Sequence, residues 1–320
     1  MTARTDPFRG PAEEIARTIA GDDDARFLLV FQALLNQAHG FAATDDPAGL
    51  ARTLLRRGTA GRRAAPAGRS HEVEGLYGDR TFLRNARAMA VNRKRIVGGE
   101  RTAAFPDCVA VGSAHDWCCS GTLVAPNVVV TAAHCLDQGC GDRVFFGEDV
   151  AFPDSGRTVG VRRAVPAPRF AEEDPFGDLA VLILRDAADV APRVIARPDA
   201  LDDATFVRVA GFGNTDVDST GGYGVKRQVD VPLAGDSPTY RADFATEFVA
   251  GAPFLDVDSC QGDSGGPAYV SVAGEWQLAG ATSRAVKHRG RPVRPCGDGG
   301  VYTRVGEYEE WIRSVPGGRW

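Results

Sequence analysis

Residues 260–267 read Cys-Gln-Gly-Asp-Ser-Gly-Gly-Pro, with one glycine two positions before the serine and two glycines directly after it. Glycine lets the backbone turn tightly, so this composition favours a sharp turn. The backbone N–H groups of such a turn can point at a group that becomes bonded to the serine side chain. An isolated serine would carry no such expectation. The stretch therefore makes Ser264 a candidate nucleophile.

Two segments upstream supply the groups that such a serine needs. Residues 129–135 read Val-Val-Thr-Ala-Ala-His-Cys, and residues 178–184 read Asp-Leu-Ala-Val-Leu-Ile-Leu. Taken alone, the first is typical of a structural histidine and the second of an aspartate in a turn. Taken together, a neutral imidazole can remove the serine proton, and a buried carboxylate can hold the imidazole tautomer and stabilise the imidazolium. His134, Asp178 and Ser264 are thus predicted to carry out acyl transfer.

In this order and at these separations, the three segments resemble the trypsin/chymotrypsin family of serine endopeptidases, over about residues 96–312. The resemblance implies an all-β two-barrel protease domain, with His134 and Asp178 on the first barrel and Ser264 on the second. It implies peptide-bond hydrolysis in the cleft between the barrels, with no cofactor. No metal is expected, because the loop after Gly147 and Glu148 lacks the second glutamate of the family's calcium site. The resemblance also assigns the oxyanion hole to the backbone N–H groups of Gly262 and Ser264, where one donor typically contributes ~3 kcal/mol.

The resemblance extends to a zymogen activation junction. Residues 96–99 read Ile-Val-Gly-Gly and follow Arg95. By resemblance, cleavage after Arg95 frees the ammonium of Ile96, which then pairs with Asp263. This pairing would order the oxyanion hole and the specificity pocket.

Substrate specificity is predicted from Asp258, six positions before the serine, which by resemblance lies at the base of the primary pocket. A buried carboxylate there selects Arg or Lys, because an unpaired buried charge is costly. Gly300 matches the open wall of the same pocket. Arg95 fits this specificity, so the protein could activate itself or be activated by a protease of similar preference.

The opposite pocket wall departs from the family pattern. Where the family usually has Ser-Trp-Gly, this chain has Ser283, Arg284 and Ala285. The change removes an aromatic shelf, introduces a cation expected to favour acidic substrate side chains, and narrows the pocket mouth with a methyl group. Residues 287–294 then form a basic stretch, read either as a solvated loop or as a docking surface for an acidic partner.

The seven cysteines all lie between Cys108 and Cys296 and indicate a disulfide framework in one domain. The family resemblance implies two bridges, Cys119–Cys135 and Cys260–Cys296. For the three remaining cysteines two pairings stay open, Cys118 with Cys140 or Cys108 with Cys118. Disulfides suit a secreted or extracytoplasmic protein, yet the first 25 residues show no secretory signal, so a cytoplasmic location stays open as well.

The first third of the 320-residue chain is predicted to be separate from the protease domain. Apolar spacing predicts helices within residues 1–57, and residues 58–95 form a Gly-, Ala-, Pro- and Arg-rich linker and activation segment that ends with a short helix over 81–90. The protease domain is predicted over 96–320. The helical region could be a propeptide or an adaptor that binds a partner.

Composition excludes several classes of protein. Lys+Arg 37 against Asp+Glu 42 gives a net charge of −5, which offers no basic footprint for nucleic acid. The longest near-apolar run, residues 27–35, is too short to span a membrane. The family resemblance implies the partners, which are protein or peptide substrates with Arg or Lys at the cleavage site and an activating protease, unless the protein activates itself. An inactive protease fold that serves as a binding or scaffold protein is the alternative.

Short β-branched runs broken by Gly, Pro and Asp after residue 95 predict an antiparallel barrel or sandwich. The sequence predicts a closing helix over 307–314 and the following strands: 108–111, 120–124, 128–131, 143–146, 158–165, 179–184, 206–210, 226–232, 267–272, 277–280 and 300–304.

Overall fold

The computed structural model describes residues 99–170, 175–215, 221–236, 240–251, 258–286, 296–297 and 299–316, together with Thr81 and Asn85. The helices predicted within residues 1–57, most of the 58–95 linker and the basic stretch 287–294 lie outside the described residues. The division of the chain into three regions therefore stays a prediction.

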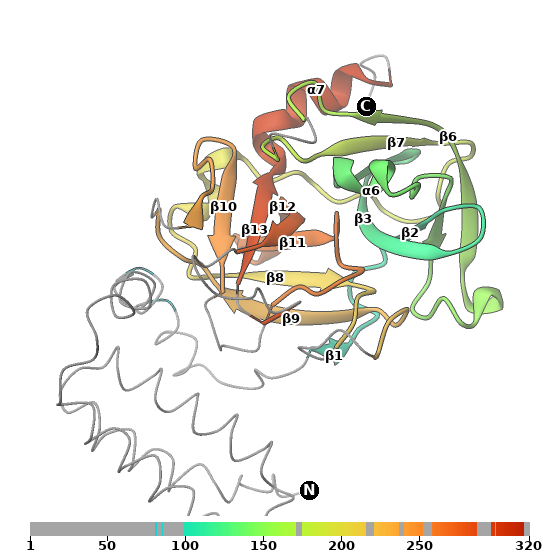
Figure 1. Ribbon diagram of the computed structural model, residues 1–320, viewed down its shortest axis with the longest axis horizontal. Helices are drawn as coiled ribbons and strands as arrows, with labels where there is room; N and C mark the ends of the chain where they lie inside the picture. The colour runs from blue at the N-terminus through green and yellow to red at the C-terminus, as the bar shows by residue number, and fades with distance from the viewer. Residues whose placement is uncertain are drawn as a thin grey trace, which may run out of the picture.

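The first half of the described chain forms a closed six-stranded antiparallel barrel (Figure 1, green). Its strands lie in the order β2-β3-β4-β7-β6-β5, and β5 closes the barrel by pairing with β2. Their bounds are β2 Cys108–Gly112, β3 Trp117–Ala125, β4 Val128–Thr131, β5 Arg143–Phe146, β6 Arg157–Pro166 and β7 Ala180–Leu184.

The second half forms a seven-stranded antiparallel sheet in the order β1-β9-β8-β11-β12-β13-β10. The sheet curls on itself, because Leu233, just after β9, bridges Ala250 at the end of β10. The predicted all-β two-barrel class is confirmed. The strands are β1 Glu100–Arg101, β8 Phe206–Gly211, β9 Arg227–Pro232, β10 Glu247–Ala250, β11 Pro267–Val272, β12 Glu275–Ala285 and β13 Gly300–Arg304.

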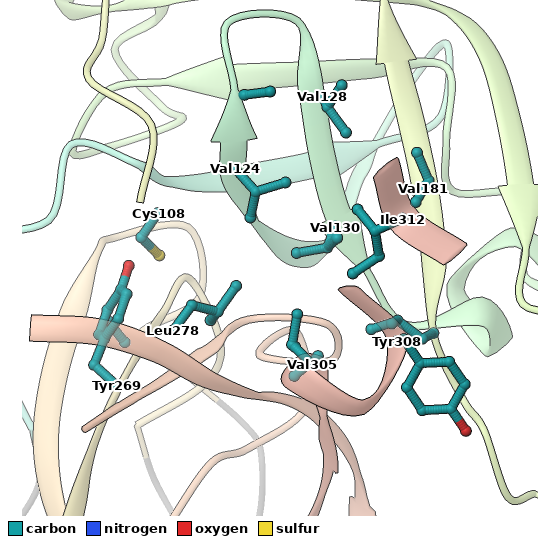
Figure 2. Close-up of a cluster of buried hydrophobic side chains, with 14 of the residues drawn as sticks. Cys108, Val124, Val128, Val130, Val181, Tyr269, Leu278, Val305, Tyr308 and Ile312 are labelled. Carbon is teal, nitrogen blue, oxygen red and sulfur yellow. The ribbon is translucent and has the colours of Figure 1, made fainter. Parts of the chain in front are cut away.

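One hydrophobic cluster is shared by the two sheets and fixes them against each other (Figure 2). Val124, Val130 and Val181 come from the first barrel, and Leu278 comes from the second sheet. Ile312 of the C-terminal helix, fully buried, packs into the same cluster. Burial of apolar side chains between the sheets holds the loops on either side of their junction in a fixed relation.

The helices described after residue 98 are short. They are α6 Ala133–Asp137 and α7 Glu309–Ser314, with 3-10 turns at Pro153–Ser155 (η1), Pro198–Leu201 (η2) and Val305–Tyr308 (η4). Within the part of the chain that the structure describes, none of the helices is long and apolar enough to cross a membrane.

Most predicted strands are present with bounds within one or two residues, and four differences stand out. The sequence did not predict α6, β1 or β10 as elements. The strand predicted over 277–280 is β12, which runs from Glu275 to Ala285 because it bends through a register shift against β13 and so keeps pairing beyond its apolar core. This extension carries Ser283 and Arg284 into the sheet.

Asn85 connects the N-terminal part of the chain to the second sheet. It is helical, as predicted for residues 81–90, and only 1% exposed. Its side-chain amide donates a hydrogen bond of 3.0 Å to the carbonyl oxygen of Leu233. A buried amide with such a partner is a specific contact, so at least this position of the predicted linker packs on the protease domain.

Candidate active site

His134 and Asp178 meet at one end of the first barrel. β4 pairs with β7 so that Thr131 lies opposite Ala180, which brings the residues following β4 next to those preceding β7. His134, in the first turn of α6, donates its backbone N–H to Asp178 Oδ1 at 3.0 Å, and its Nδ1 lies 2.7 Å from Asp178 Oδ2. The two contacts fix both the position and the orientation of the imidazole.

Asp178 is almost fully enclosed, with its side chain 4% exposed against 24% for that of His134. The Ser283 hydroxyl donates to Asp178 Oδ2 at 2.7 Å, and the Thr303 hydroxyl donates to its backbone carbonyl at 3.0 Å. Burial opposes ionisation, but hydrogen bonds and charge attraction from His134, with the bond from Ser283, outweigh it and lower the pKa of Asp178. The group is therefore a carboxylate at neutral pH.

Ser264 lies on a turn before β11 that packs directly on the segment leading to His134. Its carbonyl oxygen accepts a 2.8 Å hydrogen bond from the backbone N–H of Ser120 in β3. Gly265 has φ +75°, and a Cβ there would collide with the Thr131 hydroxyl and the Ala132 backbone nitrogen. Glycine is required at this position by both conformation and space, and this close approach brings the serine turn against the histidine segment.

The serine turn presents unpaired donors. Gly262 has φ +95°, and its carbonyl oxygen accepts a hydrogen bond from the Ser120 hydroxyl, which directs the carbonyl inward. Among the described residues, neither the N–H of Gly262 nor that of Ser264 has a hydrogen-bond acceptor. His134 Nε2 and Ser264 Oγ are likewise not hydrogen-bonded to each other within this part of the chain, a contact that in unliganded sites often tightens only with substrate.

Asp258 lies on the turn that leads to Ser264, with its carboxyl group enclosed although the residue as a whole is partly accessible. Oδ1 accepts hydrogen bonds from the Ser259 N–H at 2.7 Å and the Tyr302 hydroxyl at 3.1 Å. Burial raises the pKa of Asp258 to about 7, against these hydrogen bonds. A Cβ on Gly300 would lie 3.0 Å from Oδ1, so glycine leaves the space beside the carboxyl group open.

Asp263 is a second enclosed carboxyl group next to the serine. Oδ1 accepts from the Gly213 N–H and Oδ2 from the Cys260 N–H, both at 2.8 Å. Burial raises its pKa to about 6, although both hydrogen bonds oppose the shift. In the described part of the chain no cationic side chain forms an ion pair with Asp263. Arg95 and Ile96 lie outside the described residues.

Arg284 is not the free cation that the sequence suggests. Its guanidinium forms a two-point ion pair with Glu247 in β10, at 2.6 and 2.8 Å. Glu247 is fully buried, so the charge of Arg284 is neutralised from within the fold. Ala285 follows at the end of β12, opposite Gly300 of β13.

Three disulfides surround the site. Cys119 is bonded to Cys135 beside His134, and Cys260 is bonded to Cys296 beside the pocket. Of the two pairings left open, the structure contains Cys118–Cys140, and Cys108 is a buried free thiol. Burial raises the pKa of that thiol far above its ordinary value, so it is unreactive.

Sequence reasoning missed Glu247, Tyr302 and Ser120 as site residues. Glu247 stands next to the apolar run Phe-Val-Ala, and a carboxylate in such a run signals a buried partner. The Tyr302 hydroxyl in β13 donates to Asp258 on the turn before Ser264, and the Ser120 hydroxyl in β3 donates to the Gly262 carbonyl of the second half. These two contacts join residues far apart in the chain and leave no local signal.

A closed barrel packed on a second curled sheet, with His134 and Asp178 on one and the Ser264 turn on the other, has the architecture of a two-barrel serine hydrolase. Comparison with known proteins agrees. Residues 96–312 match the family model described as Trypsin. The chain belongs to the trypsin family of serine proteases.

Two relatives illustrate the similarity. The chain is 35% identical over 200 residues to a protein named Trypsin from Saccharopolyspora erythraea, across 59% of this chain and 83% of that protein. It is 31% identical over 245 residues to Transmembrane protease serine 5 of Homo sapiens, across 69% of this chain and 51% of that protein. The chain thus spans about half the length of the human relative.

Proposed function

We propose that this protein is a serine endopeptidase that is made as a zymogen and cleaves peptide bonds after Arg or Lys through an acyl-enzyme on Ser264. The observation that carries the proposal is the position of Asp178. Its carboxylate holds His134 Nδ1 at 2.7 Å while the serine turn packs on the residues just before that histidine.

The reaction follows from these positions. His134 Nε2 takes the proton of Ser264 Oγ as the oxygen attacks the scissile carbonyl carbon. The resulting oxyanion accepts hydrogen bonds from the unpaired N–H groups of Gly262 and Ser264. The C–N bond then breaks, and His134 gives the proton to the leaving amine. Water then attacks the acyl carbon while His134 takes its proton. The bond to Ser264 Oγ breaks, His134 returns the proton to that oxygen, and the acid is released.

Arg or Lys preference is supported by Asp258. Its carboxyl group is desolvated, and the glycine at 300 leaves room beside it. A guanidinium or ammonium group entering this space would replace the lost hydration and stabilise the carboxylate.

Activation at the Arg95–Ile96 bond is supported by Asp263. A desolvated carboxylate held by two N–H groups and by no ion pair in the described chain is a poorly compensated charge. A new ammonium from Ile96 would compensate it and would hold the turn that carries Gly262 and Ser264 in its present form.

The test is hydrolysis of chromogenic peptides by the purified chain before and after cleavage between Arg95 and Ile96. Replacing the residues before Ile96 with the site of an exogenous protease keeps the new terminus unchanged. We expect hydrolysis of Arg- and Lys-ended peptides only after cleavage, and a loss of about 10⁵-fold or more in kcat for Ser264→Ala. Arg95→Gln in the unmodified chain should block activation.

Two outcomes would contradict the proposal in different ways. A cleaved protein that is labelled on Ser264 by a fluorophosphonate but hydrolyses only peptides with other residues would refute the Arg/Lys specificity. A cleaved protein with a verified Ile96 terminus that is neither labelled nor active would be a binding protein on a protease fold.

A further inference from the structure

The Arg284 guanidinium is held by four contacts next to the candidate catalytic residues. Nη1 donates to Glu247 Oε1 at 2.6 Å and to the Ser283 hydroxyl oxygen at 3.3 Å. Nη2 donates to Glu247 Oε2 at 2.8 Å and to the Arg241 carbonyl at 3.3 Å. A planar guanidinium that donates to both oxygens of one carboxylate is held in a fixed orientation.

Glu247 is itself anchored. It lies in β10, is fully buried, and its Oε2 also accepts the backbone N–H of Asp243 at 2.9 Å. On the outer side, the Arg284 guanidinium carbon lies 5.5 Å from the centre of the Phe176 ring. The ion pair is therefore a fixed part of the fold, with the Arg284 side chain only 20% exposed.

The contact with Ser283 occupies a lone pair of that hydroxyl and leaves its hydrogen free to point at Asp178. A serine hydroxyl has one hydrogen, and a guanidinium has donors only. With Arg284 Nη1 donating to its oxygen, Ser283 is left to direct its hydrogen to Asp178 Oδ2, 2.7 Å away. In such a series of hydrogen bonds, from Arg284 through Ser283 to Asp178, each bond polarises and strengthens the next.

We propose that Arg284, fixed by Glu247, is a positioning residue that acts through the Ser283 hydroxyl to orient and hold the Asp178 carboxylate. This inference rests on the proposed protease function. Asp178 keeps His134 oriented, so a less firmly held carboxylate would misplace the imidazole. The ion pair is neutral overall and so supplies a fixed donor without adding net charge to the site.

The test uses a neutral double variant, Arg284→Met with Glu247→Gln, because removing Arg284 alone leaves a buried unpaired carboxylate and risks misfolding. The substrate is an acetylated single-arginine anilide, which does not extend into more distant subsites. In the cleaved protein we expect kcat to fall about tenfold with KM nearly unchanged. Asp178, less engaged by Ser283, would favour the protonated His134, moving the acid limb of the kcat profile up by about half a pH unit.

A matched control exists in the same sheet. Arg208 in β8 forms a two-point ion pair with Asp230 in β9, at 2.6 and 2.8 Å. Neither residue belongs to the segments that carry His134, Asp178, Ser264 or Ser283. Arg208→Met with Asp230→Asn removes a pair of the same two-point geometry, in which the carboxylate side chain is 25% exposed instead of fully buried. We expect kcat and its acid limb to stay as in the unsubstituted enzyme. Thermal unfolding of both double variants establishes that each is folded.

The route through Ser283 is tested by repeating the double change in a Ser283→Ala background. If Arg284 acts through this hydroxyl, the double change there has no further effect on the acid limb. An unmoved acid limb in the first background, or an equal movement in both, would overturn the inference. Failure of the proposed function is separate, since the unsubstituted cleaved enzyme would then not hydrolyse the anilide.

Discussion

At the scale of single residues, Asp258 and Asp263 stand in similar surroundings but have different parts in the proposed function. Both carboxyl groups are desolvated, and burial raises the pKa of both, to about 7 and about 6. Asp258 has a glycine-walled space beside it, whereas Asp263 is enclosed by Gly211 and Gly213, where any Cβ would collide with its carboxylate. We therefore expect the partner of Asp258 to come from the substrate and the partner of Asp263 from the chain itself.

The raised pKa of Asp258 predicts pH-dependent binding of cations in the pocket. Above about pH 7 the carboxylate is ionised and can pair with benzamidine, whereas below it binding must first release a proton. Affinity should then fall by up to about tenfold for each pH unit below 7. Calorimetry with the cleaved Ser264→Ala protein between pH 5 and 8 measures this directly.

The stability of the unliganded protein depends on pH with the opposite sign. Because the folded pKa of Asp258 lies above its ordinary value, its contribution to stability is lost as the pH rises from about 4 through about 7, and a bound amidinium offsets that loss. Asp258→Asn is the control, with weak binding that does not vary with pH. A flat affinity in the parent protein across this range would contradict the raised pKa of Asp258, and affinity equal to that of Asp258→Asn would show that Asp258 does not contact the cation.

His134, Asp178 and Ser264 could be predicted from the sequence at this scale, because the glycines around Ser264 limit the backbone and the three stretches occur together in the order of the family that they resemble. The partners of these residues could not. Glu247 is separated from Arg284 by 37 residues, and only the pairing of β10 with β13 and of β13 with β12 brings them together.

At the scale of elements, α6 is the part of the site that depends most on tertiary contacts for its stability. It has five residues and no side-chain cap, too few to be stable alone. Two disulfides tie this segment to β3, Cys119–Cys135 within the helix and Cys118–Cys140 after it. The adjacent cysteines 118 and 119 thus hold the middle of α6, directly after His134, and the chain just beyond the helix.

The two bridges should differ in their effect on activity. Replacing either pair with alanine removes a cross-link over 16 or 22 residues, and we expect each to cost about 3 kcal/mol of unfolding free energy. Only the loss of Cys119–Cys135, which adjoins His134, should also lower kcat, by about tenfold if the imidazole moves on the order of 1 Å or less. Denaturant unfolding and peptide hydrolysis measure the two effects, and an equal loss of kcat in both variants would contradict the distinction.

Strands could be predicted where apolar and polar residues alternate, or where an apolar run lies between turn residues. β4 and β11 are examples, and their bounds match the prediction. β10 was missed because it begins with the charged Glu247 and has only three apolar residues after it, and α6 was missed because five residues carry too little periodicity. Tertiary contacts decide both elements.

At the scale of the whole molecule, a buried polar cluster joins the two halves. Asp107, fully buried before β2, accepts hydrogen bonds from Arg193 at 2.5 and 3.1 Å and from the Tyr269 hydroxyl of β11 at 2.6 Å. Arg193 lies in the segment that connects the first barrel to the second sheet, and it also donates to the Trp276 carbonyl. The cluster therefore complements the apolar contacts of Figure 2.

Breaking this cluster should destabilise the molecule as a unit. Asp107→Asn leaves Arg193 without its counter-charge, and we expect a loss on the order of 3 kcal/mol in unfolding free energy. Asp199→Asn, which removes the carboxylate of the exposed Arg197 pair, is the matched control and should change stability by no more than about 0.5 kcal/mol. Urea unfolding compares the two, and equal losses would show that burial of the cluster contributes nothing.

The contact of Asn85 with the Leu233 carbonyl has a consequence for the molecule after cleavage at Arg95. Before the cut, the intervening chain keeps the two groups at a high effective concentration. After it, the piece that ends at Arg95 is a separate chain, and its retention depends on its dissociation constant and on dilution. The activated enzyme would then be a two-chain complex in concentrated solution and a lone protease domain when dilute.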